Sequence, residues 1–283
     1  MINYNKLFEK SKEIANKSEL TQLELYQRFM FERILERISV SKYCNNFILK
    51  GGLLLSAMLG IQSRSTRDMD VSIKGIDVAK EKMLEVLNEI LAIDVNDKVK
   101  FEIVNISDIR EDDEYGGNKY HLVGKLENLK VALEIDISTG DEITPRELNY
   151  EYNSLFEDKK IYIDSYNIET ILAEKIETIL RRGKYNARMK DYYDVYFFLH
   201  NMKYEINNAD FRSALNNTLI KRESLEYYKD YEIILKEIST YERINEKWNI
   251  YSKKNKYANG IEFKNIIELI IEFIARIEEK SIV

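Results

Sequence analysis

The sequence of 283 residues contains one cysteine, Cys44, and two histidines, His121 and His200. These small numbers exclude a disulfide framework within the chain and a zinc site built from cysteines. They also leave little for a histidine-rich metal centre. We therefore expect any metal site in this protein to be built mainly from carboxylates.

Long apolar segments and helix-breaking residues are also scarce. No apolar run approaches the roughly 18 residues needed to cross a membrane, so we expect no membrane partner and a cytoplasmic location. One proline, ten glycines and many Lys, Glu, Ile and Leu residues favour helix. The net charge of −6 argues against a uniformly basic nucleic-acid coat but permits a local basic patch.

The order of residue patterns along the chain predicts an α+β protein. Residues 3–39 have helical spacing, residues 45–165 mix strand-like and helical patterns, and the chain from residue 168 onward favours helix. We therefore expect an α/β domain with a mixed sheet over residues 1–165, which includes the N-terminal helices. A helical C-terminal domain is expected over residues 166–283.

Three aspartates on two strand-like segments are the main candidates for chemistry. Asp68 and Asp70 alternate with apolar residues, so they share one face of a strand. Residues 120–138 read as a hairpin closed around Glu127-Asn128, and its second arm places Asp136 on the polar face. Mg²⁺ prefers such carboxylate oxygens. A solvated strand edge is the simpler interpretation of Asp-x-Asp alone, but the third aspartate favours a metal site.

Gly51 and Gly52 follow a short apolar run, residues 47–49, and precede a helix-like stretch, residues 53–59. This order predicts a strand, a tight turn and a helix whose first amides can bind phosphate. A glycine pair alone more often only permits a turn. The glycine pair therefore indicates a phosphate-binding turn only in combination with the aspartates that follow it.

Lys175 interrupts the apolar stripe of the helix predicted over residues 168–180, so we expect this lysine to point inward. Its aliphatic stem could lie along the core, or its ammonium could bind triphosphate oxygens. Asp191 and Asp194 lie on the next, aromatic helix, where at least one of them needs a cationic partner. Lys175 and Arg188 are both candidates.

A basic run follows Lys175 in this acidic protein. It contains five basic residues and no acid within ten positions: Arg181, Arg182, Lys184, Arg188 and Lys190. Such a run is usually a solvated face. The alternative is a surface that binds the phosphates of a nucleotide or RNA.

Six segments occur in an order that is typical of one family. They are Leu49-Lys50-Gly51-Gly52, Arg64-Ser65-Thr66-Arg67-Asp68-Met69-Asp70, Glu134-Ile135-Asp136-Ile137, Gly140-Asp141-Glu142-Ile143-Thr144-Pro145, Ala173-Glu174-Lys175 and Arg188-Met189-Lys190-Asp191-Tyr192-Tyr193-Asp194. Together they resemble the nucleotidyltransferases of the DNA polymerase β superfold, and more closely the AbiEii/AbiGii toxins of abortive-infection and toxin–antitoxin systems. The resemblance covers about residues 48–200.

The resemblance implies a polymerase β-like nucleotidyltransferase core and a role for each matching residue. The implied metal ligands, for a site with two Mg²⁺ ions, are Asp68, Asp70 and Asp136; the third could also deprotonate the acceptor hydroxyl. The implied nucleotide-binding residues are Gly51, Gly52, Ser65, Thr66 and Lys175. Lys175 and either Asp191 or Asp194, with Asp191 favoured, match the essential lysine and acid.

The function implied by the resemblance is Mg²⁺-dependent transfer of a nucleoside monophosphate from an NTP to RNA. The expected acceptor is the 3′ end of tRNA, bound with the help of Arg181, Arg182, Lys184 and Arg188, so that translation stops. The expected context is phage defence with a cognate antitoxin, with or without a stable complex. The alternatives are a small-molecule acceptor, as in aminoglycoside nucleotidyltransferases, and a catalytically silent nucleotide- or partner-binding module.

Overall fold

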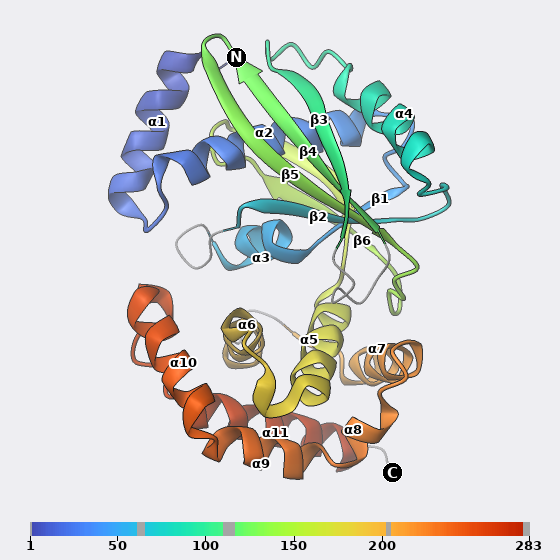
Figure 1. Cartoon of the computed structure of the whole chain (residues 1–283), viewed down its shortest axis with the longest axis vertical. Helices are drawn as coiled ribbons and strands as arrows, with labels where there is room; N and C mark the ends of the chain where they lie inside the picture. Colours follow the sequence, from blue (N-terminus) through green and yellow to red (C-terminus); the bar gives the residue numbers. More distant parts are fainter. Residues whose placement is uncertain (1, 61–65, 110–116, 202–204, 280–283) are drawn as a thin grey trace. The chain divides into compact units, whose positions relative to one another are not determined.

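The computed structural model describes residues 2–60, 66–109, 117–201 and 205–279 (Figure 1). The chain divides into two compact units. The first, called the sheet unit, comprises Met1–Asp141 and Glu147–Tyr166, and the second, called the helical unit, comprises Glu142–Arg146 and Asn167–Val283. The helical unit thus takes a short insert from between two strands of the sheet unit.

In the part of the chain that the structure describes, seven strands form one sheet with the order β3-β4-β5-β2-β1-β7-β6. The pairs β2–β5 and β1–β7 are parallel and the other pairs are antiparallel, so the sheet is mixed, as the sequence predicts. The strands are β1 (Phe47–Lys50), β2 (Asp68–Ile73), β3 (Lys100–Asp108), β4 (Gly117–Leu126), β5 (Leu129–Thr139), β6 (Leu148–Asn153) and β7 (Lys160–Ser165).

Helices cover the apolar face of this sheet. The helices of the sheet unit are α1 (Tyr4–Lys17), α2 (Gln22–Val40), α3 (Gly51–Leu59) and α4 (Lys80–Leu91). A capping box of Thr21 and Glu24 begins α2, which crosses the sheet and packs on β5 and β7 (Figure 1). Met69 and Ile135 are buried on this face. The alternate residues of β2 and β5, which include the three aspartates, therefore lie on the opposite face.

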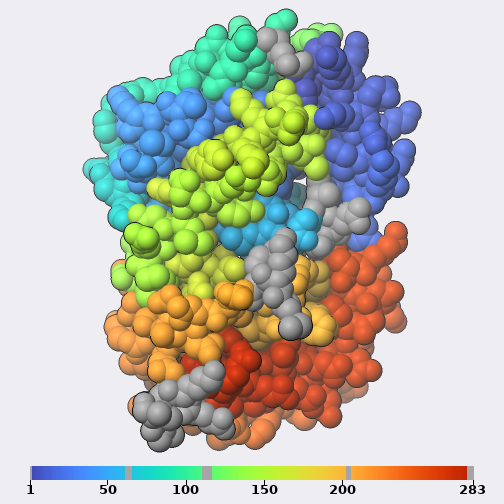
Figure 2. Space-filling view, turned by 180° about the vertical axis from the view of Figure 1, so that it is seen from behind, coloured from blue at the N-terminus to red at the C-terminus, as the bar shows by residue number. Residues whose placement is uncertain are grey.

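One strand escapes the sequence analysis. In β6, Leu148, Tyr150 and Tyr152 alternate with polar residues, which is typical of a strand, and β6 pairs with β7 along its whole length. Together β6 and β7 form a yellow-green band on the surface of the sheet unit (Figure 2). The alternation of β6 is a local signal that could have located this strand.

The helical unit packs its helices around α5 and α11. Its elements are α5 (Ile168–Arg182), η1 (Gly183–Tyr185), α6 (Met189–His200), α7 (Asn208–Lys221), α8 (Leu225–Lys229), α9 (Tyr231–Thr240), α10 (Glu242–Lys254), η2 (Lys256–Ala258) and α11 (Phe263–Glu279). α5 packs on α6 and α7, and α11 packs on α6 and α9. The insert is fixed to the start of α5, because the Thr144 N–H donates to Thr170 Oγ1 (3.1 Å). No described helix combines the length and apolarity required to span a membrane.

Candidate functional site

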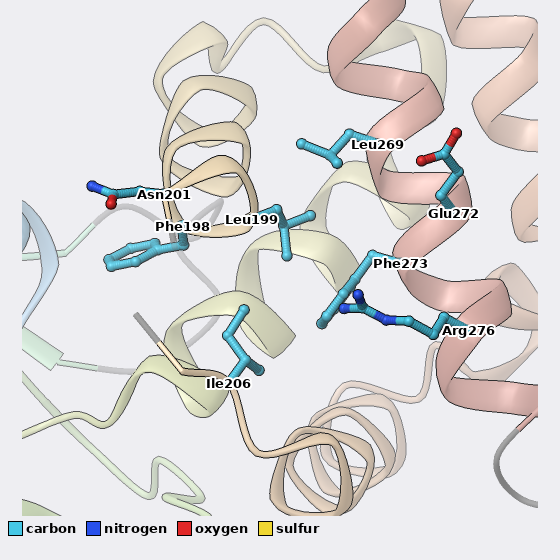
Figure 3. Close-up of a pocket in the computed structure, with 8 residues that line it drawn as sticks. All are labelled: Phe198, Leu199, Asn201, Ile206, Leu269, Glu272, Phe273 and Arg276. Atoms are coloured by element: carbon cyan, nitrogen blue, oxygen red, sulfur yellow. The ribbon is translucent and has the colours of Figure 1, made fainter. Parts of the chain in front are cut away.

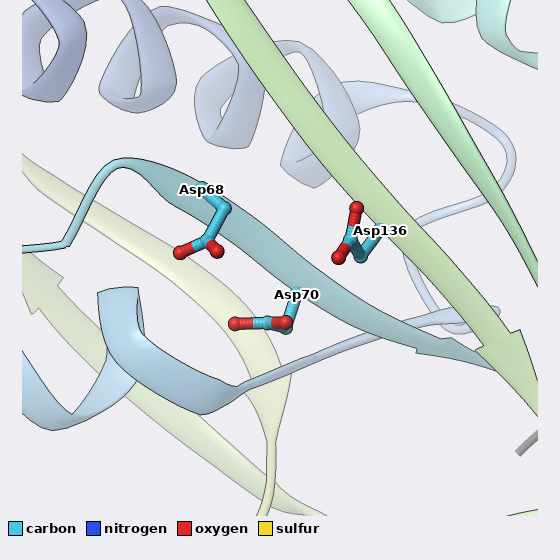
Figure 4. Close-up of side chains that lie close together, drawn as sticks. All are labelled: Asp68, Asp70 and Asp136. Carbon is cyan, nitrogen blue, oxygen red and sulfur yellow. The ribbon is translucent and has the colours of Figure 1, made fainter. Parts of the chain in front are cut away.

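The parallel pairing of β2 and β5 brings three aspartates together. Its register places Asp70 beside Asp136, and Asp68 lies two residues before Asp70 on the same face. The carboxylates of Asp68, Asp70 and Asp136, called here the carboxylate cluster, offer oxygens that all lie within 4.8 Å of one another (Figure 4). Each is partly exposed. The cluster can therefore be reached by a ligand from one face of the sheet.

The turn between β1 and α3 holds Asp70 in place. Gly51 has a φ of +62°, and a Cβ atom there would lie 2.0 Å from Asp70 Oδ2, so a side chain would collide with the carboxylate. The Gly52 N–H donates to the same Asp70 oxygen (3.2 Å). The glycine pair thus has a visible structural role in positioning Asp70, besides the phosphate role expected from the sequence.

Asp68, the first residue of β2, is held by Thr66, which lies two residues before it. Thr66 Oγ1 donates to Asp68 Oδ1 (2.8 Å), so Thr66 orients a carboxylate of the cluster. Ser65, the other residue expected to bind nucleotide before Asp68, lies outside the described residues.

The three carboxylates disfavour one another's ionisation. Burial, and then the charges of Asp68 and Asp136, raise the pKa of Asp70 to about 6. Burial also raises the pKa of Asp136, with Lys119 opposing and Asp68 adding to the effect. A bound divalent cation would relieve this repulsion, and oxygen-only ligands suit Mg²⁺. The residues present therefore fit a divalent metal ion.

Two lysines beside the cluster were missed by the sequence analysis. Lys119 Nζ lies 3.0 Å from Glu134 Oε2 and 3.1 Å from Asp136 Oδ1. The predicted turn at Glu127-Asn128 could have located it, because a two-residue turn fixes the hairpin register and so places Lys119 opposite Asp136.

The other lysine, Lys50, immediately precedes the glycine turn. Its Nζ lies 2.7 Å from Oδ2 of Asp141, whose side chain is fully buried, and Ser138 Oγ donates to the same oxygen (3.2 Å). Burial opposes the ionisation of Asp141, but the attraction of Lys50 outweighs it and lowers the pKa of Asp141. This ion pair joins the end of β1 to the segment that follows β5, and so fixes the base of the glycine turn.

In the helical unit, Lys175 binds both candidate acids. Its Nζ lies 2.6 Å from Asp191 Oδ1 and 2.8 Å from Asp194 Oδ2. The side chain of Asp194 is fully buried, whereas those of Lys175 and Asp191 are each 13% exposed. Lys175 thus points inward as predicted, and of the two acids Asp191 is the one that solvent reaches.

The basic run of α5 and η1 is partly neutralised by acids of its own unit. Arg181 Nε lies 2.7 Å from Oε1 of Glu177, a buried carboxylate that Arg222 also binds (2.6 Å). Lys184 pairs with Glu237 (2.5 Å). Arg181 therefore stabilises α5 through a buried ion network, a role that the charge run alone did not indicate.

A pocket of about 340 Å³ lies within the helical unit (Figure 3). Its described lining is mainly apolar and comes from the end of α6, the segment before α7, and α11: Phe198, Leu199, Asn201, Ile206, Leu269, Glu272, Phe273 and Arg276. This lining provides one basic side chain, Arg276, which is too few for a triphosphate. The described lining of this pocket therefore does not fit a triphosphate.

Asp70→Asn should stabilise the protein in metal-free buffer at neutral pH. Because the folded-state pKa of Asp70 is raised, the stability associated with its protonated form is complete below about pH 4 and is lost as the pH rises through about 6. Asn keeps an acceptor for the Gly52 N–H but has no charge. Urea denaturation at pH 7.5 should show a gain of roughly 1 to 3 kcal/mol. That gain should shrink at pH 5, and an unchanged or lower stability at pH 7.5 would contradict the charge crowding.

Known proteins of similar fold were found among solved structures. JHP933 from Helicobacter pylori aligns with a TM-score of 0.51 and 15% identity over 92% of this chain and 94% of that chain. A second H. pylori structure, described as a candidate nucleotidyltransferase, aligns with a TM-score of 0.50 and 15% identity over 92% of this chain and 97% of that chain. At this identity the likeness shows the fold alone, and it agrees with the expected α+β architecture.

Sequence comparison identifies the family. No curated protein matches the chain. The family model described as nucleotidyl transferase AbiEii toxin, type IV toxin–antitoxin system, matches residues 33–268. Because this match spans most of the chain, the protein belongs to the AbiEii family of nucleotidyltransferase toxins, as its sequence motifs predicted.

Proposed function

We propose that this nucleotidyltransferase transfers a nucleoside monophosphate from an NTP to an RNA hydroxyl, with Mg²⁺ bound at the carboxylate cluster. The observation that carries the proposal is the set of three carboxylates whose oxygens lie within 4.8 Å on one sheet face of a family member. The acceptor oxygen forms a bond to the α-phosphorus, the bond to the β-phosphate oxygen breaks, and pyrophosphate leaves. The acceptor proton passes to a carboxylate, for which Asp136 is our candidate.

The chain's own residues hold this site in shape. Gly51 leaves room for the Asp70 carboxylate, the Gly52 N–H orients it, and Thr66 orients Asp68. Mg²⁺ ions bound by Asp68, Asp70 and Asp136 would neutralise triphosphate charge and lower the pKa of the attacking hydroxyl. We assign phosphate binding to the amides at the start of α3, in agreement with the general affinity of helix N-termini for anions.

Lys175 and Asp191 are our candidates for the essential lysine and acid of the family. Each of these side chains is 13% exposed, so a ligand can reach the ion pair, which supports this assignment. Asp194 is assigned a structural role, since its buried carboxylate balances the charge of Lys175. In this arrangement Asp194 keeps Lys175 in place.

The acceptor is proposed to be the 3′ end of tRNA, so that transfer blocks translation in the cytoplasm. Arg181, Arg182, Lys184 and Arg188 are our candidates for RNA binding, because they are close together in sequence on an otherwise acidic protein. The type IV toxin family implies a cognate antitoxin. We propose that the toxin acts in phage defence and that the antitoxin counteracts it with or without forming a stable complex with it.

Asp70→Asn should reduce transfer at least 100-fold while leaving the protein folded, because it removes a charged ligand from the carboxylate cluster. The measurement is to incubate each protein with Mg²⁺, total bacterial tRNA and one α-labelled NTP at a time, and to follow label on a denaturing gel. Asp77→Asn, the same substitution at an exposed aspartate of the sheet unit, is the matched control and should retain full transfer. Equal labelling by Asp70→Asn and wild type would contradict the assignment of Asp70. Label on small molecules but not on tRNA would favour a small-molecule acceptor.

Asp191→Asn and Asp194→Asn should separate chemistry from stability. Asp194→Asn leaves Lys175 with less buried counter-charge, so it should lower the free energy of unfolding by a few kcal/mol. Asp191→Asn should lower stability less than Asp194→Asn does, because Asp194 still balances the charge of Lys175, yet it should reduce transfer at least tenfold. Urea denaturation and the tRNA assay provide the two readouts. The reverse pattern would assign the functional role to Asp194.

A further inference from the structure

Lys119 pairs with two acids on the neighbouring strand, and one of them belongs to the carboxylate cluster. Its Nζ lies 3.0 Å from Glu134 Oε2 and 3.1 Å from Asp136 Oδ1. Lys119 and Asp136 are directly opposite in the antiparallel pairing of β4 with β5. The backbone register itself therefore keeps the ammonium beside the carboxylate.

The Lys119 ammonium binds Asp136, a carboxylate that a divalent cation at the carboxylate cluster would also bind. Asp68 and Asp70 both lie on β2, whereas Asp136 lies on β5, so a cation that joins the two strands must bind Asp136. A positive charge 3.1 Å from Asp136 Oδ1 repels an incoming cation. Lys119 and the cation consequently compete for one carboxylate.

Glu134 provides the ammonium with a second partner. Its side chain is 47% exposed, and its other oxygen, Oε1, lies 3.5 Å from His121 Nδ1. When Asp136 turns to a cation, Lys119 can keep its contact with Glu134 and its charge is not left unpaired. Lys119 can therefore contact both Glu134 and Asp136 when no cation is bound. When a cation binds Asp136, Lys119 can contact Glu134 alone.

We propose that Lys119 is an internal counter-ion that competes with divalent cations for Asp136 and so weakens their binding to the nucleotide-free protein. The inference rests on the metal site of the proposed function and adds to it a residue that controls metal loading. A cation at Asp68 and Asp70 meets less competition, because Lys119 is paired with Asp136. The oxygens of a bound triphosphate would add ligands that help a cation to displace Lys119 from Asp136.

The test is a Mn²⁺ titration of the full chain without nucleotide, with free Mn²⁺ measured by its electron paramagnetic resonance signal. Lys119→Met should bind Mn²⁺ at least about tenfold more tightly than wild type, because a neighbouring charge at such distances commonly changes an ionic equilibrium by this factor. Lys125→Met is the matched control: Lys125 lies on the same face of β4, pairs with Glu102, and its removal changes the net charge equally. Its Mn²⁺ affinity should stay within about twofold of wild type.

Further variants make each outcome decisive. Lys119→Arg keeps the positive charge and should bind Mn²⁺ like wild type, and Lys119→Gln replaces Lys119→Met if circular dichroism shows the latter to be unfolded. Equal Mn²⁺ affinity of wild type and the Lys119 variants overturns the inference, as does equal tightening by Lys125→Met. In that case weaker binding by Asp70→Asn would still support the metal site. Absence of Mn²⁺ binding in all of these proteins would overturn both the metal site and the inference.

Discussion

Three carboxylates on one face of the sheet repel one another, and the surrounding residues must offset this repulsion. Asp68, Asp70 and Asp136 offer oxygens within 4.8 Å of one another, and burial, together with this crowding, raises the pKa of Asp70 to about 6. The chain offsets the repulsion with the Lys119 ammonium at Asp136 and the Gly52 N–H at Asp70. Charge kept concentrated at such a cost in stability is typical of a functional site.

Backbone pairing between strands brings these carboxylates close together. Parallel pairing of β2 with β5 sets the position of Asp136, and the turn at Gly51 admits the Asp70 carboxylate where any Cβ would collide. The ion pair of Lys50 with Asp141 then fixes the base of that turn. In the helical unit, Lys175 lies between one partly exposed acid, Asp191, and one buried acid, Asp194.

Much of this could be predicted from the sequence, because strand alternation and motif order are local signals. They located the mixed sheet, the faces of the aspartates, the inward lysine and the family. Long-range pairing is not a local signal, so the Lys50–Asp141 ion pair and the contact of Arg222 with Glu177 were missed. The alternation of β6 and the i,i+4 pair of Glu177 with Arg181 are local signals that were overlooked. Lys119 lies between these cases, since the register implied by the turn at Glu127-Asn128 already placed it opposite Asp136.

A crystal structure with Mn²⁺ and a non-hydrolysable NTP analogue would show whether the carboxylate cluster binds metal, because anomalous scattering locates manganese independently of any assumed role. We expect a manganese peak at coordination distance from the carboxylates of Asp68, Asp70 and Asp136, with the triphosphate against the start of α3. Nucleotide bound elsewhere, with no manganese at these aspartates, would contradict this expectation.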